Sequence, residues 1–264
     1  MEEFGKLEER VVLVGVQTDD HDNVEESLDE LKELASTAGA VTVGRIIQNR
    51  ESVHPGTYIG KGKIEEVRAL VYAMDATGII CDDELSPAQL NNLERELDCK
   101  VMDRTLLILD IFAARAITSE GKIQVELAQL RYRSARLVGL RESLSRLGGG
   151  IGTRGPGEKK LETDRRLIRT RISALKQELS QVEKHRELIR SSRARGNMKT
   201  AAIVGYTNAG KSTLFNRLTR GEVYAADQLF ATLDPTARRC FVDENTEVVL
   251  SDTVGFIRGL PHQL

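Results

Sequence analysis

The sequence reads GYTNAGKST at residues 205–213, after an apolar run at 201–204 and at the start of a helix-forming segment at 211–218. This stretch matches the pattern G-x-x-x-x-G-K-[S/T], which requires a strand before the loop and a helix after it. The backbone N–H groups of such a loop point inward, and the positive end of the helix dipole adds to the attraction for a phosphate. The stretch therefore predicts a phosphate-binding loop between a buried strand and a helix, with a chance glycine turn as the alternative.

Every residue of this loop is a candidate contact to a nucleotide, and two have specific expected roles. We expect the Lys211 ammonium to bridge the β- and γ-phosphates and the Ser212 hydroxyl to ligate Mg²⁺. Asn208 has two interpretations: it resembles the asparagine with which some GTPases bind a monovalent cation, here K⁺, and asparagine also caps loops readily. The candidate nucleotide-binding residues are Gly205, Tyr206, Thr207, Asn208, Ala209, Gly210, Lys211, Ser212, Thr213 and Asp252.

Two segments after the loop narrow the class of nucleotide-binding protein. An apolar run at 248–250 leads into DTVG at 252–255, where we expect Asp252 to hold Mg²⁺ through water and the Gly255 N–H to meet the γ-phosphate. The segment FATLD at 230–234 places Thr232 where it reaches Mg²⁺ and becomes ordered only on a triphosphate. In this order and spacing, the segments predict a switch GTPase. The predicted Mg²⁺ ligands are Ser212, Thr232 and Asp252, and the predicted catalytic residues are Lys211, Thr232, Gly255 and Phe256.

Upstream of the loop, the segment 119–196 has the periodicity of two long helices. Apolar residues recur at a seven-residue step between positions 161 and 189, and a similar stripe runs between 123 and 147. Between the stripes lies GGGIGTRGPGE at 148–158, so we expect an antiparallel helical hairpin with a small, flexible tip.

Charge is distributed unevenly along the chain. Residues 1–121 contain 12 Lys and Arg against 25 Asp and Glu, residues 122–196 contain 19 against 8, and residues 197–264 contain 7 of each. The surplus in the middle segment exceeds what pairs within it, such as Glu162 with Arg166, can neutralise. We therefore favour contact with RNA phosphates, weakened by salt, over a solvated helix face. The candidate RNA contacts are Arg154, Lys159, Lys160, Arg165, Arg166 and Arg169.

The first 118 residues alternate between strand and helix patterns. Strands are predicted at 11–16, 41–47, 78–81 and 100–102, and helices at 23–38, at about 63–73, after Ser86 and at 106–116. The sequence Ser86-Pro87-Ala88-Gln89 supplies an N-cap, a first-turn proline and a capping-box glutamine. This order favours a parallel sheet. The predicted fold is α/β, with an N-terminal α/β subdomain at 1–118, a long helical hairpin at 119–196 and the first part of a P-loop GTPase domain at 197–264.

Composition excludes several classes of protein. No apolar run approaches the roughly 18–20 residues of a membrane helix, and the acidic start MEEFGKLEER is unlike a secretory leader. Cys81, Cys99 and Cys240 are far apart and form no CxxC pair, which argues against a disulfide framework or a zinc site. We expect a cytoplasmic monomer with no membrane span.

The motifs GYTNAGKST, FATLD and DTVGF, together with GGIGTRGPGE, KKLETDRR and YIGKGKIEE at 58–66, resemble the HflX family of ribosome-associated GTPases. The resemblance extends over nearly the whole chain. It implies GTP as substrate with Mg²⁺, and the large ribosomal subunit and its rRNA as partners. It further implies that the hairpin loop reaches toward the peptidyl-transferase centre and that the protein splits or rescues stalled ribosomes. A nucleotide-regulated RNA-binding or assembly module without splitting activity, and an ATP-using P-loop protein, are the alternatives.

Two features depart from the usual GTPase pattern. Phe256 stands where many switch GTPases have a glutamine that orients water, so we hypothesise slow intrinsic hydrolysis that the ribosome accelerates. The alternative is that Phe256 only packs and another side chain orients the water. The sequence stops at Leu264, before the Asn-Lys-x-Asp guanine motif, and residues 197–264 are fewer than the ~100–150 of a complete domain. We therefore expect weak nucleotide binding by this chain and an unfinished sheet edge.

Overall fold

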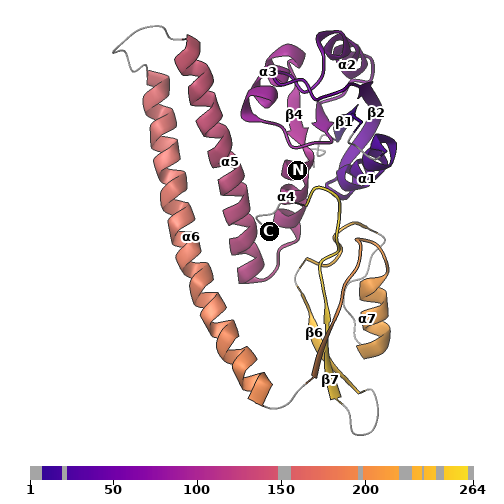
Figure 1. The fold of residues 1–264 in the computed structure, drawn as a ribbon, viewed down its shortest axis with the longest axis vertical. Coiled ribbons are helices and arrows are strands. Elements are labelled where there is room, and N and C mark those ends of the chain that lie inside the picture. Colours follow the sequence, from indigo (N-terminus) through magenta and orange to yellow (C-terminus); the bar gives the residue numbers. More distant parts are fainter. Residues whose placement is uncertain are drawn as a thin grey trace, which may run out of the picture. The chain divides into compact units, whose positions relative to one another are not determined.

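The computed structural model, drawn in Figure 1, divides into two units. It describes residues 8–19, 23–147, 156–195, 199–219, 228–233, 235–241 and 247–260. The first unit comprises residues 1–110 with 131–168, and the second comprises residues 111–130 with 169–264. Two long helices, α5 (Ser119–Leu147) and α6 (Pro156–Arg195), contribute to both units. The subdomain boundaries expected near residues 118 and 196 stay a prediction.

The first unit is built on a parallel sheet with the strand order β2-β1-β3-β4. Its strands are β1 (Glu9–Gln17), β2 (Ala40–Asn49), β3 (Gly78–Cys81) and β4 (Lys100–Asp103). The helices that connect them are α1 (Val24–Thr37), α2 (Lys61–Ala73) and α3 (Pro87–Leu97). Every pairing in this sheet is parallel, which confirms the predicted α/β class.

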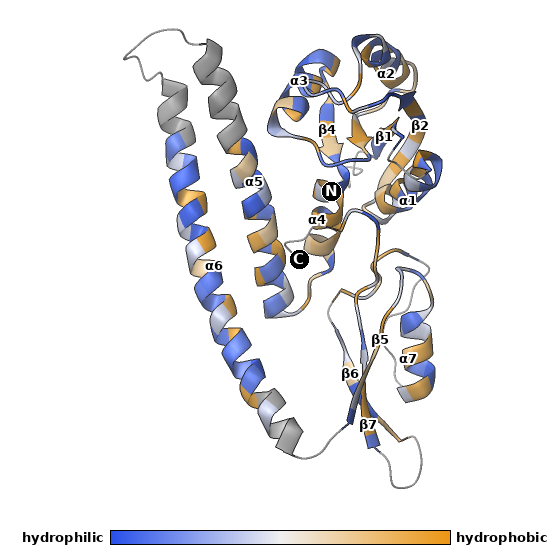
Figure 2. Ribbon diagram, in the orientation of Figure 1, coloured by the Kyte–Doolittle hydropathy of each residue, from blue (hydrophilic) through white to orange (hydrophobic). Residues whose placement is uncertain are grey.

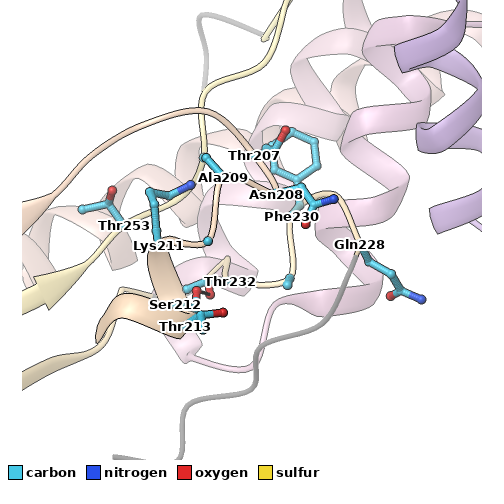
Figure 3. Close-up of a pocket in the computed structure, with 13 residues that line it drawn as sticks. Thr207, Asn208, Ala209, Lys211, Ser212, Thr213, Gln228, Phe230, Thr232 and Thr253 are labelled. Atoms are coloured by element: carbon cyan, nitrogen blue, oxygen red, sulfur yellow. Dashed lines mark hydrogen bonds between the residues drawn. The ribbon is translucent and has the colours of Figure 1, made fainter. Parts of the chain in front are cut away.

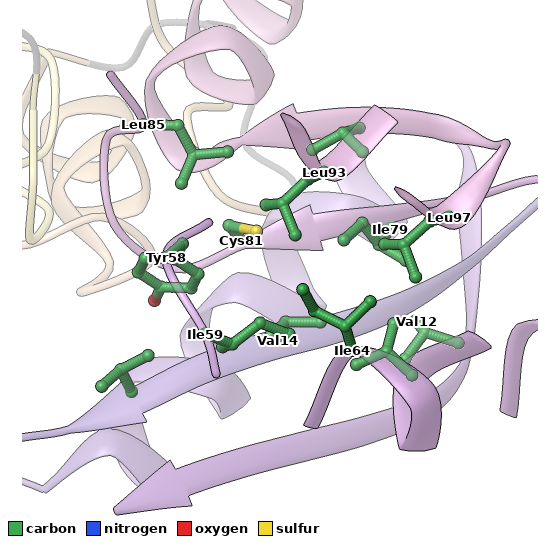
Figure 4. Close-up of a cluster of buried hydrophobic side chains, with 13 residues drawn as sticks. Val12, Val14, Tyr58, Ile59, Ile64, Ile79, Cys81, Leu85, Leu93 and Leu97 are labelled. Carbon is green, nitrogen blue, oxygen red and sulfur yellow. The ribbon is translucent and has the colours of Figure 1, made fainter. Parts of the chain in front are cut away.

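The core of the first unit follows the alternation of side chains along the strands. Val12, Val14 and Val16 of β1 belong to one cluster with residues of α2 and α3, shown in Figure 4. The alternate position Gly15 faces α1 instead, because a Cβ there would lie 2.7 Å from a side-chain carbon of Val24. Both faces of β1 are therefore covered, which explains why its sequence is continuously apolar.

The start of α3 has the predicted capping box. The Ser86 side chain accepts a hydrogen bond from the Gln89 N–H at 3.2 Å, and the Gln89 side chain accepts one from the Ser86 N–H at 2.9 Å. Pro87 occupies the first helical position, where its missing N–H has no intrahelical partner to lose. The local sequence thus fixes where this helix begins.

Buried charged residues gather where β3 and β4 end and α4 (Arg104–Arg115) begins. Arg104 donates to the Asp82 carboxylate at 2.6 Å and to the Ser27 carbonyl at 2.7 Å, and it also pairs with Glu30. Asp103, next to it, accepts from the Tyr132 hydroxyl at 2.5 Å and from Arg136 at 2.6 Å.

The contacts of Arg104 and Asp103 connect this end of the sheet to neighbouring helices. Burial and the nearby Asp103 raise the pKa of the Tyr132 phenol, so the phenol stays a hydrogen-bond donor at neutral pH. Through Arg104 and Asp103, the end of the sheet is connected to α1 and to the part of α5 that belongs to the same unit.

In the second unit, α5 and α6 run antiparallel. Glu126 of α5 pairs with Arg171 of α6 at 2.7 Å, and Glu120 pairs with Arg186 at 2.8 Å, so residue numbers rise along one helix as they fall along the other. Leu175, at a predicted seam position of α6, is buried. Outside this seam α6 is mostly hydrophilic over its described length, as Figure 2 shows. None of the described helices is long and apolar enough to cross a bilayer.

The second unit also contains a three-stranded sheet with the order β5-β7-β6. Its elements are β5 (Lys199–Ile203), α7 (Lys211–Thr219), β6 (Ala237–Phe241) and β7 (Glu247–Asp252). β5 pairs in parallel with β7, and β6 pairs with β7 in the antiparallel sense. The expectation of a buried strand at 201–204 was wrong about burial, because β5 is an edge strand of this sheet and most of it is exposed.

Candidate nucleotide-binding site

The site lies where β5 and β7 end side by side. Ile203, the last residue of β5, is paired with Asp252, the last residue of β7, so the segments that follow the two strands start at the same edge. Two main-chain bonds hold these segments together: Thr207 N–H donates to the Phe256 carbonyl at 2.9 Å, and Phe256 N–H donates to the Gly205 carbonyl at 3.0 Å. Main-chain hydrogen bonds therefore hold the phosphate loop and the DTVG segment against each other.

The loop between β5 and α7 encloses a cavity (Figure 3). Asn208 has φ 58° and Gly210 has φ 81°, so two residues in the left-handed region turn the chain into α7. All the loop residues from 207 to 213 line the cavity, together with Gln228, Phe230, Ala231, Thr232, Thr253 and Gly255. Gly205 and Tyr206 lie outside this lining and contribute backbone carbonyl contacts instead.

The three predicted Mg²⁺ ligands meet beside the cavity. The Ser212 hydroxyl lies 2.7 Å from the Thr232 hydroxyl and 2.6 Å from Asp252 Oδ2, and the Thr232 hydroxyl lies 3.1 Å from the same carboxylate oxygen. Magnesium binds oxygen ligands at 2.0–2.1 Å in an octahedron, whose adjacent oxygens are about 2.8–3.0 Å apart. The Ser212 and Thr232 hydroxyls are therefore spaced like adjacent ligands of one Mg²⁺ ion, and the fully buried Asp252 carboxylate, hydrogen-bonded to both, supplies negative charge beside them, as expected of a group that holds Mg²⁺ through water.

Lys211 reaches across the loop. Its ammonium group donates to the Tyr206 carbonyl at 2.6 Å. Desolvation by burial lowers the pKa of Lys211, while the charge of Asp252 opposes this shift. A bound phosphate would replace the lost hydration of this ammonium, which suits the predicted role of Lys211.

Phe256 is neither buried nor polar. Its side chain is 54% exposed, while its main-chain N–H and carbonyl are both bonded to the phosphate loop. Thr253, which the motif analysis did not single out, donates its hydroxyl to the Ile203 carbonyl at 2.6 Å and ties the DTVG segment to β5. The backbone of this segment is fixed, yet no polar side chain stands at position 256.

Gly255 is required by a close backbone approach. A Cβ at this position would lie 2.5 Å from Thr207 Cα and 2.6 Å from the Thr207 nitrogen, and neither atom can rotate away. Gly255→Ala is therefore expected to push the DTVG segment off the phosphate loop. A displacement of about 1 Å can reduce turnover on the order of 100-fold, and we expect a loss of this size in Mg²⁺-dependent GTP hydrolysis.

A matched control is Gly62→Ala in α2, where an added Cβ meets nothing within 4 Å. Alanine in a helix is favoured over glycine by up to about 1 kcal/mol, so this variant should keep full activity and unfold at an equal or higher temperature. Equal activities of the two variants would contradict this role of Gly255.

Sequence reasoning missed the residues that hold the segment just before Thr232 in place. Phe112 and Arg115, at the end of α4, contact residues 228–230. They lie more than 110 positions away in the sequence and belong to no motif. Phe230 has φ 54°, a conformation that costs a non-glycine residue about 1–3 kcal/mol and that no sequence pattern reveals.

The predicted RNA contacts are described only in part. Arg165 is half-buried on α6, and Arg169 is exposed, as is Arg166, which has a bonding partner. The side chains of Lys159 and Lys160, and the whole of Arg154, lie outside the described residues. The described part of the hairpin therefore carries two exposed arginines of the predicted set.

Three protein-family models match successive parts of the chain. A GTP-binding GTPase N-terminal model matches residues 25–113, a GTP-binding GTPase middle-region model matches 115–193, and a 50S ribosome-binding GTPase model matches 200–263.

Curated relatives match over nearly the whole chain. It is 67% identical over 262 residues to the GTPase HflX of Lacrimispora saccharolytica, covering 99% of this chain and 62% of that protein. It is 55% identical over 257 residues to the GTPase HflX of Escherichia coli K12, covering 97% of this chain and 60% of that protein. The chain thus spans about three fifths of the length of these relatives.

Solved structures support the fold. The crystal structure of SsGBP in complex with GDP has a TM-score of 0.55 at 28% identity, covering 97% of this chain and 65% of that one. A GTP-binding protein from Sulfolobus solfataricus, also in complex with GDP, has a TM-score of 0.52 at 25% identity, covering 97% and 63%. The curated relatives and the three consecutive family matches show that the chain belongs to the HflX family of GTPases.

Proposed function

We propose that the whole protein hydrolyses GTP with Mg²⁺ and that it binds the large ribosomal subunit through its basic hairpin, in order to split or rescue stalled ribosomes in the cytoplasm. The observation that carries the catalytic part is the triangle of Ser212, Thr232 and Asp252 oxygens beside a phosphate loop. This triangle joins the phosphate loop to the FATLD and DTVG segments. A triphosphate is the ligand that needs all three of these segments.

Each group of the site has a role in this reaction. Ser212, Thr232 and Asp252 would hold Mg²⁺, which when bound neutralises charge on the β- and γ-phosphate oxygens. Lys211 would leave the Tyr206 carbonyl to pair with the same phosphates. The Gly255 N–H would donate to the γ-phosphate. Phe256 has no group to orient the attacking water, so intrinsic hydrolysis should be slow and an external polar group should accelerate it.

The ribosomal part of the proposal rests on charge and on the relatives. Residues 122–196 have eleven more basic than acidic side chains, and the family model that matches 200–263 describes a 50S ribosome-binding GTPase. Phosphate contacts by arginine release counterions, so binding should weaken steeply as salt rises.

Neutralising the described hairpin arginines tests this interface. The triple variant Arg165→Gln, Arg166→Gln and Arg169→Gln should weaken binding to large subunits. It should also reduce the slope of log affinity against log salt by up to about one for each phosphate that the variant no longer binds. Filter binding at several salt concentrations measures both quantities.

A control with the same change in charge uses residues of exposed ion pairs in the first unit: Arg45→Gln, Lys63→Gln and Lys100→Gln. This control should leave the salt slope unchanged. An unchanged affinity and slope in the hairpin variant would refute the interface.

The splitting activity is tested by sedimentation. Intact ribosomes mixed with the whole protein and GTP should separate into subunits on a sucrose gradient, and this separation should require the Lys211 side chain. Co-sedimentation with large subunits without any separation would instead favour a nucleotide-regulated assembly module. Displacement of bound GTP by equimolar ATP would contradict the guanine preference that the family implies.

A further inference from the structure

The last turn of α4 holds the segment that precedes Thr232. Arg115 donates from Nη1 to the Leu229 carbonyl at 2.9 Å and from Nη2 to the Gln228 side-chain oxygen at 2.8 Å. The rings of Phe112 and Phe230 meet edge to face with their centroids 4.5 Å apart. We call these contacts of Phe112 and Arg115 with residues 228–230 the α4 anchor.

The aromatic part of the α4 anchor is buried, whereas the Arg115–Gln228 bond lies at the surface. Phe112, Leu229 and Phe230 are 3%, 4% and 2% exposed, so the contact between the two rings excludes water. Phe230 has φ 54°, an outlier for a bulky residue that persists only when its surroundings hold it. Among the described residues, the aromatic contact and the two guanidinium bonds restrain this segment. A planar guanidinium fixes two acceptors at once, which a flexible ammonium does not.

The α4 anchor lies close to the metal ligands along the chain. Thr232 follows Phe230 by two residues, and its hydroxyl lies 2.7 Å from Ser212 Oγ and 3.1 Å from Asp252 Oδ2. Gln228 and Phe230 themselves line the phosphate cavity. With so short a tether, a shift of the anchored segment must displace the Thr232 hydroxyl from the triangle.

We propose that Phe112 and Arg115 are positioning residues of the GTPase site, which hold Thr232 where it can bind Mg²⁺ and sense the γ-phosphate. The assignment rests on the proposed GTPase function and adds to it a control point outside the known motifs. Only residues 116–118 separate α4 from α5, and Glu120 of α5 is paired with Arg186 of α6. The anchor therefore connects the base of the hairpin to Thr232.

The test compares Arg115→Ala and Arg115→Lys with the wild type in the whole protein. In switch GTPases the γ-phosphate orders the switch loops, which are released on hydrolysis, so a Thr232 in this role would sense a triphosphate and Arg115→Ala should keep GDP affinity within about twofold and lose the preference for a non-hydrolysable GTP analogue. Single-turnover GTP hydrolysis at saturating nucleotide should fall by about 10- to 100-fold, as expected when a catalytic group is misplaced. Arg115→Lys, which can keep one of the two bonds, should lie in between.

Matched variants separate positioning from stability. Arg239→Ala removes an exposed arginine of the same unit, paired with Glu247, and should change neither nucleotide preference nor turnover. Phe112→Leu keeps an apolar side chain without the ring contact and should reproduce the loss of preference at an unfolding temperature near that of the wild type.

The outcomes are distinct. Unchanged or faster turnover and an unchanged nucleotide preference in Arg115→Ala would overturn the assignment and leave the proposed function intact. A wild-type protein without Mg²⁺-dependent GTP binding would overturn the proposed function and, with it, the assignment.

Discussion

Replacing Lys211 with alanine is expected to abolish Mg²⁺-dependent GTP hydrolysis by the whole protein. Lys211 is the charged donor of the phosphate loop, and its ammonium donates to the Tyr206 carbonyl at 2.6 Å. Removing one such donor from a transition state typically costs about 10²–10³ in rate. We therefore expect a loss of at least about 100-fold in single-turnover hydrolysis, with a parallel loss of GTP affinity.

The control for this variant is Lys199→Ala. Lys199 is an exposed lysine of β5 in the same unit, and its removal changes net charge by the same amount. Its turnover should match that of the wild type. If the two lysine variants had the same activity, the phosphate loop would not be the catalytic site.

Replacing Arg104 with alanine is expected to have the largest effect on stability. The side chains of Arg104 and Asp82 are only 5% and 3% exposed, and the variant would leave the Asp82 carboxylate buried without its cation. Breaking a buried pair in this way usually costs about 3–5 kcal/mol. Urea unfolding of the whole protein, followed by circular dichroism, should show a lower unfolding midpoint for the variant than for the wild type.

Two comparisons identify the buried charge as the cause. The double variant Arg104→Met, Asp82→Leu removes both charges and should recover much of the lost stability, because apolar replacements of a buried pair are often neutral. Arg45→Ala breaks the exposed pair with Asp29 and should cost less than about 1 kcal/mol. An Arg104→Ala variant as stable as Arg45→Ala would contradict this interpretation.

Local patterns predicted the elements well. The apolar run at 11–16 lies inside β1, and the capping box at Ser86 marks the start of α3. The predicted start of α4 at 106 was two residues late, because Asp103 accepts a hydrogen bond from the Leu106 N–H at 2.9 Å and caps an earlier turn. Such caps are readable only once the preceding strand is known to end at Asp103.

Long-range contacts were beyond the sequence. The motifs placed Ser212, Thr232 and Asp252 in one site because GTPases share that order, and their oxygens do meet. Nothing in the sequence indicated that Arg115 would contact Gln228. That contact depends on tertiary packing, which periodicity and propensity do not encode.

The measurement that tests the central claim most directly is single-turnover GTP hydrolysis by the whole protein, with and without large ribosomal subunits. Phe256 offers no group to orient water, while the oxygens of Ser212, Thr232 and Asp252 lie within hydrogen-bond distance of one another. We expect slow Mg²⁺-dependent hydrolysis by the protein alone and marked acceleration by large subunits, both abolished in Lys211→Ala. Hydrolysis that large subunits leave unchanged would contradict the claim that the ribosome completes this site.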